Sequence, residues 1–132
     1  MGKFGGLLVS WDPNYFELIP YLTCGGMLLT GLDLQSNRQL SFLNIYGLCS
    51  EHKSFWESLE KSGLLAQKNL ILAGDLNLTP SSGDIWGGIH TLGTLASFFI
   101  NYFYKNKLID IVPRTLVSTW RNDLAGNEAI SK

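Results

Sequence analysis

A short apolar segment near the middle of the chain limits the possible folds most. Asn69–Gly74 contains four consecutive apolar residues, Leu70–Ala73, and polar residues lie on both sides of it. A continuous apolar run of this length is typical of a strand that is buried on both faces of a sheet. The segment therefore predicts a central strand with other structure packed against both of its faces.

The first third of the chain predicts several further strands. The apolar segments there are Phe4–Trp11, Tyr15–Thr23, Met27–Leu34 and Leu40–Tyr46. Pro20 interrupts the second segment, so we expect an edge strand or two short pieces there. The polar segment Gln35–Arg38 predicts a hairpin between the last two segments. Both faces of Leu40–Tyr46 are largely apolar, which predicts burial on both sides.

Helical spacing follows the predicted hairpin. Ser50 is a suitable N-cap, Phe55, Trp56 and Leu59 recur at helical spacing, and Gly63 suits the C-terminal end. The remaining segments predict a surface loop at Thr79–His90, a helix at Thr91–Tyr104 with Leu92, Leu95, Phe99 and Phe103 on one face, and strands at Lys107–Val112 and Leu116–Trp120. Strands followed by alternating helices and strands predict an α/β or α+β fold with a mixed sheet.

Composition limits the class of protein. The chain has 132 residues, which fits one domain, and its 45% hydrophobic and 16% charged residues exclude a disordered chain. Its net charge of -1 gives no basic excess of the kind that marks an autonomous nucleic-acid-binding domain. Two cysteines, Cys24 and Cys49, are too few for a disulfide scaffold, so we expect buried or half-buried thiols in a reducing compartment. With neither a signal peptide nor an apolar stretch of about 20 residues, we expect a cytoplasmic or nuclear location, no secretion and no membrane partner.

The segment Gly74-Asp75-Leu76-Asn77 carries the chemistry. It follows the predicted central strand directly, and polar groups at strand ends are where α/β folds place their sites. With one residue between them, Asp75 and Asn77 are expected to leave the same face of the strand. A carboxylate there can orient or deprotonate water or bind a metal, and a carboxamide can donate to a phosphate oxygen. The alternative is an ordinary Asx turn that ends the strand.

Neighbouring segments extend this pattern. The strand Phe42–Tyr46 ends in Asn-x-Tyr and leads through a predicted helix to Gly-Asp-x-Asn, and Leu108–Val112 and Ser118–Asn122 follow in order. In this order the segments resemble the endonuclease/exonuclease/phosphatase superfamily, and more narrowly the apurinic-type endonuclease domain of plant LINE-type (non-LTR) retrotransposons. The resemblance covers roughly Gly5 to Lys132. It implies a two-sheet β-sandwich flanked by helices, Mg²⁺-dependent phosphodiester hydrolysis and DNA as the partner.

The resemblance also implies roles for three residues. Asp75 resembles the aspartate that positions or deprotonates the attacking water, and Asn77 resembles its partner at the phosphate and the metal. Tyr46 resembles the tyrosine whose hydroxyl contacts the scissile phosphate. Without the motif, Tyr46 reads as a strand-end tyrosine with its ring in the core. We interpret five other polar and aromatic residues as structural: Asp110, Trp120, Trp86, His52 and His90.

Several elements of the family pattern have no counterpart here. The family's glutamate, its principal Mg²⁺ ligand, is expected before Gly5, and its Arg-x-Asp and Ser-Asp-His elements are expected after Lys132. We therefore expect a truncated domain, a partial sandwich from the middle of the family fold, with doubtful Mg²⁺ binding and little activity alone. We also expect open sheet edges that favour self-association. Two alternatives remain open, a non-catalytic remnant or interaction protein with this fold and a phosphatase of the same superfamily.

Overall fold

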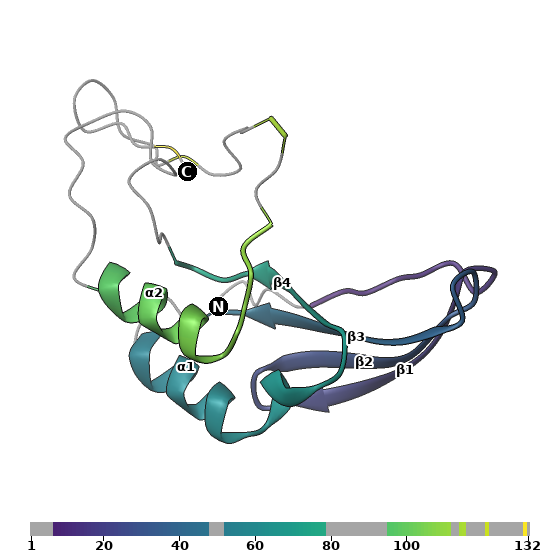
Figure 1. Cartoon of the computed structure of the whole chain (residues 1–132), viewed down its shortest axis with the longest axis horizontal. Coiled ribbons are helices and arrows are strands. Elements are labelled where there is room, and N and C mark those ends of the chain that lie inside the picture. Colours follow the sequence, from purple (N-terminus) through teal and green to yellow (C-terminus); the bar gives the residue numbers. More distant parts are fainter. Residues whose placement is uncertain are drawn as a thin grey trace, which may run out of the picture. The chain divides into compact units, whose positions relative to one another are not determined.

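The computed structural model describes residues 7–47, 52–78, 95–111, 114, 115, 121 and 131. The chain divides into two compact units, Met1–Asn77 and Leu78–Lys132. The first unit holds strands β1 (Phe16–Thr23), β2 (Gly26–Asp33), β3 (Arg38–Tyr46) and β4 (Leu70–Asp75), helix α1 (His52–Lys61) and the short 3₁₀ helix η1 (Leu64–Ala66) (Figure 1). The second unit contains helix α2 (Ala96–Lys105).

The four strands form one mixed sheet in the order β1-β2-β3-β4. Neighbouring strands from β1 to β3 are antiparallel, and β4 runs parallel to β3. The sheet and the two helices confirm the predicted α+β class with a mixed sheet. The described residues contain one sheet, so the second sheet of the expected sandwich stays a prediction.

The hairpin between β2 and β3 forms where the polar segment predicts it. The Asp33 carboxylate accepts hydrogen bonds from the Gln35 amide at 3.0 Å and the Ser36 hydroxyl at 2.5 Å, and Asn37 adopts a left-handed conformation. Short polar side chains favour such turns because they bond the backbone locally. These bonds lower the pKa of Asp33, with the Ser36 hydroxyl as the largest cause.

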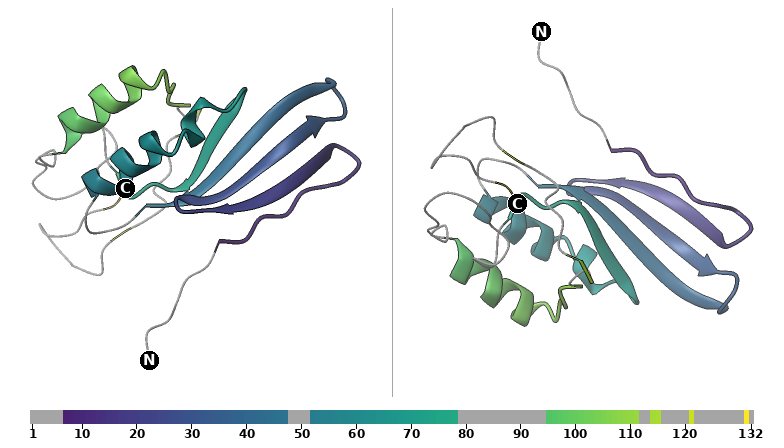
Figure 2. Two further views of the ribbon diagram at one scale, coloured as in Figure 1. Left: turned by 90° about the horizontal axis from the view of Figure 1, so that it is seen from below. Right: turned by 90° about the horizontal axis from the view of Figure 1, so that it is seen from above.

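Most of the buried core of the first unit lies on one face of the sheet. Leu28, Leu43 and Ile45 are buried on this face, and α1 contributes Trp56 and Leu59. Figure 2 shows α1 along one side of the sheet, and Leu59 reaches the β1–β2 turn, where a Cβ on Gly25 would come within 2.7 Å of its Cδ1. Helical spacing therefore placed the buried face of α1 correctly, and Gly63, at φ 76°, follows the helix as predicted.

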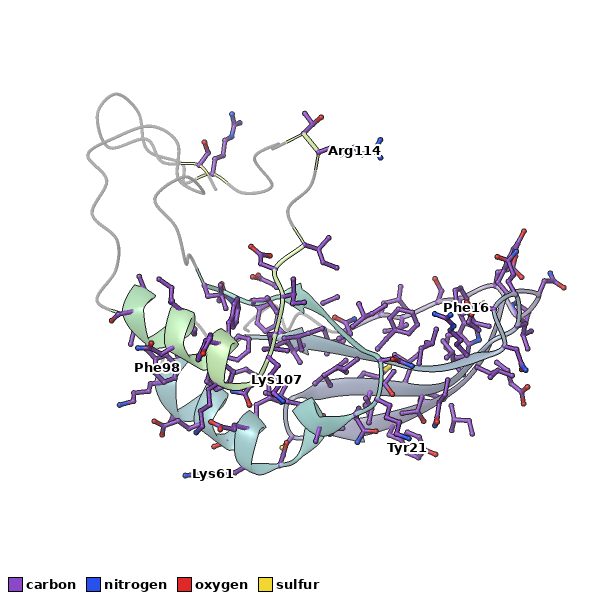
Figure 3. All side chains as sticks on the ribbon, viewed as in Figure 1. Phe16, Tyr21, Lys61, Phe98, Lys107 and Arg114 are labelled. Atoms are coloured by element: carbon purple, nitrogen blue, oxygen red, sulfur yellow. The ribbon has the colours of Figure 1, made fainter. Side chains whose placement is uncertain are left out.

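The opposite face of the sheet is less covered. Phe42 and Asn44 are half-buried there, and Tyr46 is exposed, so the expected burial of β3 on both faces is wrong. Part of this face is still apolar and packed, because Leu29 is buried and the Phe16 and Phe42 rings meet edge to face at 6.1 Å. Phe16 lies at the end of the sheet that carries the β2–β3 hairpin (Figure 3).

Four other expectations need correction. Residues 7–11 form no strand, because the Asp12 turn follows them and no described strand pairs with them. Residues 107–111 form none either, because Lys107 takes a left-handed conformation and the Leu108 amide bonds back to the Phe103 carbonyl at 2.9 Å, which closes α2. Strand β4 is an edge strand of the described sheet rather than a central one. Cys24 is exposed rather than buried.

Helix α2 is shorter than expected within the described residues and turns a slightly different face inward. Its buried residues are Ala96, Phe99 and Tyr102, whereas Leu95 and Phe103 are half-buried. Several expected features lie outside the described residues: Ser50, Cys49, Leu92, the loop 79–90 with Trp86 and His90, and the strand 116–120 with Trp120. None of the helices in the described part of the chain is long and apolar enough to cross a lipid bilayer.

Candidate functional site at the ends of β3 and β4

The parallel strands β3 and β4 bring two of the predicted site residues together. Tyr46 and Asp75 are direct register partners at the C-terminal ends of the two strands. Register partners in neighbouring strands lie about 4.8 Å apart and point to the same face. Both residues are exposed, with 55% of Tyr46 accessible. The structure therefore places a tyrosine and an aspartate at adjacent positions of neighbouring strands, both exposed.

Gly74 allows the two strands to approach closely before the site. Its φ of 120° lies in the region that L side chains rarely adopt, and a Cβ there would collide with the carbonyl oxygen of Ile45. The same Cβ would come within 2.8 Å of the Asn44 Oδ1. The Gly-Asp-x-Asn segment therefore needs glycine at this position because β4 approaches β3 closely there.

Asp75 and Asn77 are linked by an Asx turn. The Asp75 Oδ1 accepts a hydrogen bond from the Asn77 backbone amide at 3.1 Å. Strand β4 ends at Asp75, and Asn77 lies at φ 48°, a left-handed conformation that asparagine tolerates better than most residues. The two side chains are therefore related by this Asx turn, which is the alternative that the sequence left open, and not by strand alternation. Within the described residues, the second carboxylate oxygen of Asp75 has no hydrogen-bond partner.

The Asn77 carboxamide ties the ends of the two strands together. Its Nδ2 donates to the Gly47 carbonyl at 2.5 Å, and the Gly47 amide donates to the Asp75 carbonyl at 2.6 Å. Gly47 is buried, and a Cβ on it would collide with the Leu76 carbonyl. One N–H of the Asn77 carboxamide is thus used within the protein. Its Oδ1 is the atom of this carboxamide that can bind a cation.

Asn44, the asparagine of the Asn-x-Tyr pattern, also lies near the end of β3. It lies on the same face of β3 as Tyr46, two residues earlier, and its register partner on β4 is Ala73. A Cβ on Gly74 would come within 2.8 Å of the Asn44 carboxamide oxygen, and Gly74 directly precedes Asp75 in the sequence. The signal for this residue is the Asn-x-Tyr spacing at the end of the strand, because period two places both side chains on one face.

The other described polar candidates lie on other elements. His52 begins α1, and Asp110 is exposed in the second unit outside the described strands. Among the residues that the structure describes, no three His, Cys, Asp or Glu side chains gather as a metal site would require. The arrangement offers a cation one free carboxylate oxygen and one carboxamide oxygen, and it offers a phosphate the hydroxyl of Tyr46.

Neither a family model nor a curated protein sequence matches this chain. The candidate site therefore rests on the geometry of β3 and β4.

Proposed function

We propose that the ends of β3 and β4 form part of a phosphodiester-binding site of the kind that Mg²⁺-dependent endonucleases use, with DNA as the partner. The pairing of Tyr46 with Asp75 in register, both exposed at the carboxyl ends of parallel strands, carries this proposal. Ligand sites of α/β sheets lie at this end of the strands. An endonuclease of this type would act in the nucleus or cytoplasm, which is the location that we propose.

Each residue has a defined task in this proposal. The free oxygen of Asp75 binds Mg²⁺ or takes a proton from the attacking water. The Oδ1 of Asn77 supports the cation, and the N–H of its Nδ2 that is not bonded to Gly47 donates to a phosphate oxygen. The Tyr46 hydroxyl donates to a non-bridging phosphate oxygen, where it would stabilise the charge that develops during hydrolysis.

The described residues provide a weak metal site. Mg²⁺ prefers six oxygen ligands in octahedral geometry and is usually held by one or two carboxylates together with substrate phosphates. Asp75 is the one carboxylate at the ends of β3 and β4 in the described structure. We therefore propose that this chain binds Mg²⁺ and DNA weakly and hydrolyses phosphodiesters slowly or not at all when it is alone.

Paramagnetic broadening tests the site directly. Mn²⁺ replaces Mg²⁺ at oxygen sites, so titration of the ¹⁵N-labelled chain should broaden the amide signals of Tyr46, Gly47 and Asp75 before others. Asp75→Asn should abolish this broadening, whereas Glu17→Gln, which alters an exposed carboxylate on β1 of the same unit, should preserve it. Broadening that starts elsewhere, or that survives in Asp75→Asn, would contradict the proposal.

Plasmid nicking tests the proposed low activity. We expect no nicking by the folded chain with Mg²⁺ beyond the level seen with EDTA. Nicking that needs Mg²⁺ and disappears in Asp75→Ala would show that the described site suffices for catalysis.

Two other results would favour the alternative functions. Hydrolysis of phosphate monoesters but not diesters would favour a phosphatase, and a folded chain that binds neither Mn²⁺ nor DNA would favour a non-catalytic interaction protein. Self-association through an open sheet edge is a separate proposal.

A further inference from the structure

The two edges of the sheet differ in how they are protected. Strand β1 forms one edge of the sheet (Figure 2). It carries Pro20. The Leu34 amide donates to the Tyr15 carbonyl at 2.8 Å, so backbone groups of odd-numbered residues face β2 and those of Pro20 face outward. Proline has no N–H to offer an incoming strand, which is a common protection for an edge.

Strand β4 has no such protection. The Asn69 and Asp75 carbonyls accept hydrogen bonds from Ser41 and Gly47, so the odd-numbered residues of β4 face β3. The N–H and C=O groups of Leu70 and Leu72 therefore face outward. Leu70–Gly74 contains neither a proline nor a charge, and Ile71 is 42% exposed. Among the described residues no strand lies beyond β4, so this edge has the features of a strand-pairing surface.

We propose that the open edge of β4 pairs with β4 of a second copy of this chain, antiparallel and centred on Leu72. In this register Leu70 of one copy lies opposite Gly74 of the other, and the contact is symmetric about a two-fold axis. The outward groups at Leu70, Leu72 and Gly74 are evenly spaced about that axis, so each copy presents the same pattern to the other.

Charge selects the antiparallel orientation. Exposed Lys68 precedes β4, and exposed Asp75 ends it. Antiparallel pairing brings the Lys68 end of each copy to the Asp75 end of the other, which gives two pairs of opposite charge. Parallel pairing would place Asp75 beside Asp75, and like charges on facing strands destabilise a sheet. The pairing also brings the Lys68 ammonium group of one copy near Asp75 of the other. The proposed pairing does not depend on the proposed phosphodiester site.

Sedimentation and light scattering over a range of concentrations test the pairing. We expect the wild-type chain to approach twice its mass of 14.7 kDa. Ile71→Lys puts a like charge on each facing strand and should raise the dimer dissociation constant at least about tenfold. The matched control is Ile19→Lys on the β1 edge, where Ile19 is 56% exposed, and it should leave the dissociation constant unchanged. A wild-type chain of single mass at every concentration, or equal dissociation by both variants, would overturn the proposal.

A charge exchange keeps the test valid if Ile71→Lys lowers stability. Lys68→Glu changes an exposed residue outside the strand and should weaken the dimer, whereas Lys61→Glu, which alters an exposed lysine on α1 of the same unit, should not (Figure 3). The double variant Lys68→Glu/Asp75→Lys should restore the dimer. Because Asp75→Lys also removes the Asx turn, circular dichroism first checks that the variant is folded, and failure of the folded variant to restore the dimer would exclude the antiparallel register. Hydrogen exchange tests the pairing at single residues. The Leu72 amide, which faces outward, should exchange more slowly as the protein concentration rises, whereas exchange of the Ile71 amide, which faces β3, should not change.

Discussion

Replacement of Gly74 by alanine tests the close approach of β3 and β4. At φ 120° an alanine would be strained, and its Cβ would collide with the Ile45 carbonyl. Residues held in such a conformation cost about 1–3 kcal/mol. Displacing packed neighbours costs about 1–3 kcal/mol more. We therefore expect Gly74→Ala to lower the free energy of unfolding by roughly 2–6 kcal/mol, a large share of the about 5–15 kcal/mol typical of a domain.

Gly63 provides the matched control. It also has a positive φ, 76°, but a Cβ there would meet nothing within 4 Å. Gly63→Ala should therefore cost only the strain of a left-handed conformation, about 1–2 kcal/mol. Urea unfolding followed by far-ultraviolet circular dichroism measures both, and an unchanged m value makes the two comparable. If Gly74→Ala costs no more than Gly63→Ala, the two strands do not approach as closely as described, and the structural reason for this glycine is wrong.

Three further predictions address the core, the strand ends and a turn. Trp56 is fully buried, so Trp56→Ala should lower the free energy of unfolding by about 3–5 kcal/mol, measured by the same urea method. Asn77→Ala should cost about 1–3 kcal/mol, since it removes the bond to the Gly47 carbonyl and leaves alanine in a left-handed conformation; Asn77→Gly should cost less. The folded-state pKa of Asp33 lies below its ordinary value, so its stabilisation is complete above the unfolded-state pKa and is lost as pH falls through the folded-state pKa. Ser36→Ala should raise that pKa toward the ordinary value in a carboxyl NMR titration, and an unchanged pKa would show that the Ser36 hydroxyl is not the main cause.

Local patterns in the sequence predicted the elements that local physics decides. The polar Gln35–Arg38 segment correctly predicted the hairpin. Asp33 accepts a hydrogen bond within the turn and Asn37 adopts its left-handed conformation, so no distant residue is needed. The spacing of Trp56 and Leu59 correctly predicted the buried face of α1, because residues three apart lie on the same face of a helix. In these segments the side-chain pattern and the final packing agree, so the prediction holds.

Long-range pairing decided the elements that the sequence did not predict. The apolar run in β4 would fit a central strand equally well, and only its pairing with β3 makes it an edge strand in the described sheet. Likewise, Tyr46 and Asp75 are far apart in sequence, and the parallel pairing of β3 with β4 makes them register partners. The pattern located both strand ends, but it could not show that these two residues face each other.

The Asx turn at Asp75 makes one substitution more informative than the others. A turn of this kind needs only an acceptor at Oδ1, and asparagine supplies that acceptor as well as aspartate does. Asp75→Asn should therefore preserve the stability of the fold, with a change in unfolding free energy below about 0.5 kcal/mol. Cation binding, by contrast, needs the negative charge and the second oxygen, which the amide removes. Asp75→Ala removes both the turn and the charge, so it should lower stability and cation binding together. If Asp75→Asn retains Mn²⁺ binding while Asp75→Ala loses it only through unfolding, then Asp75 ends a strand and has no part in cation binding.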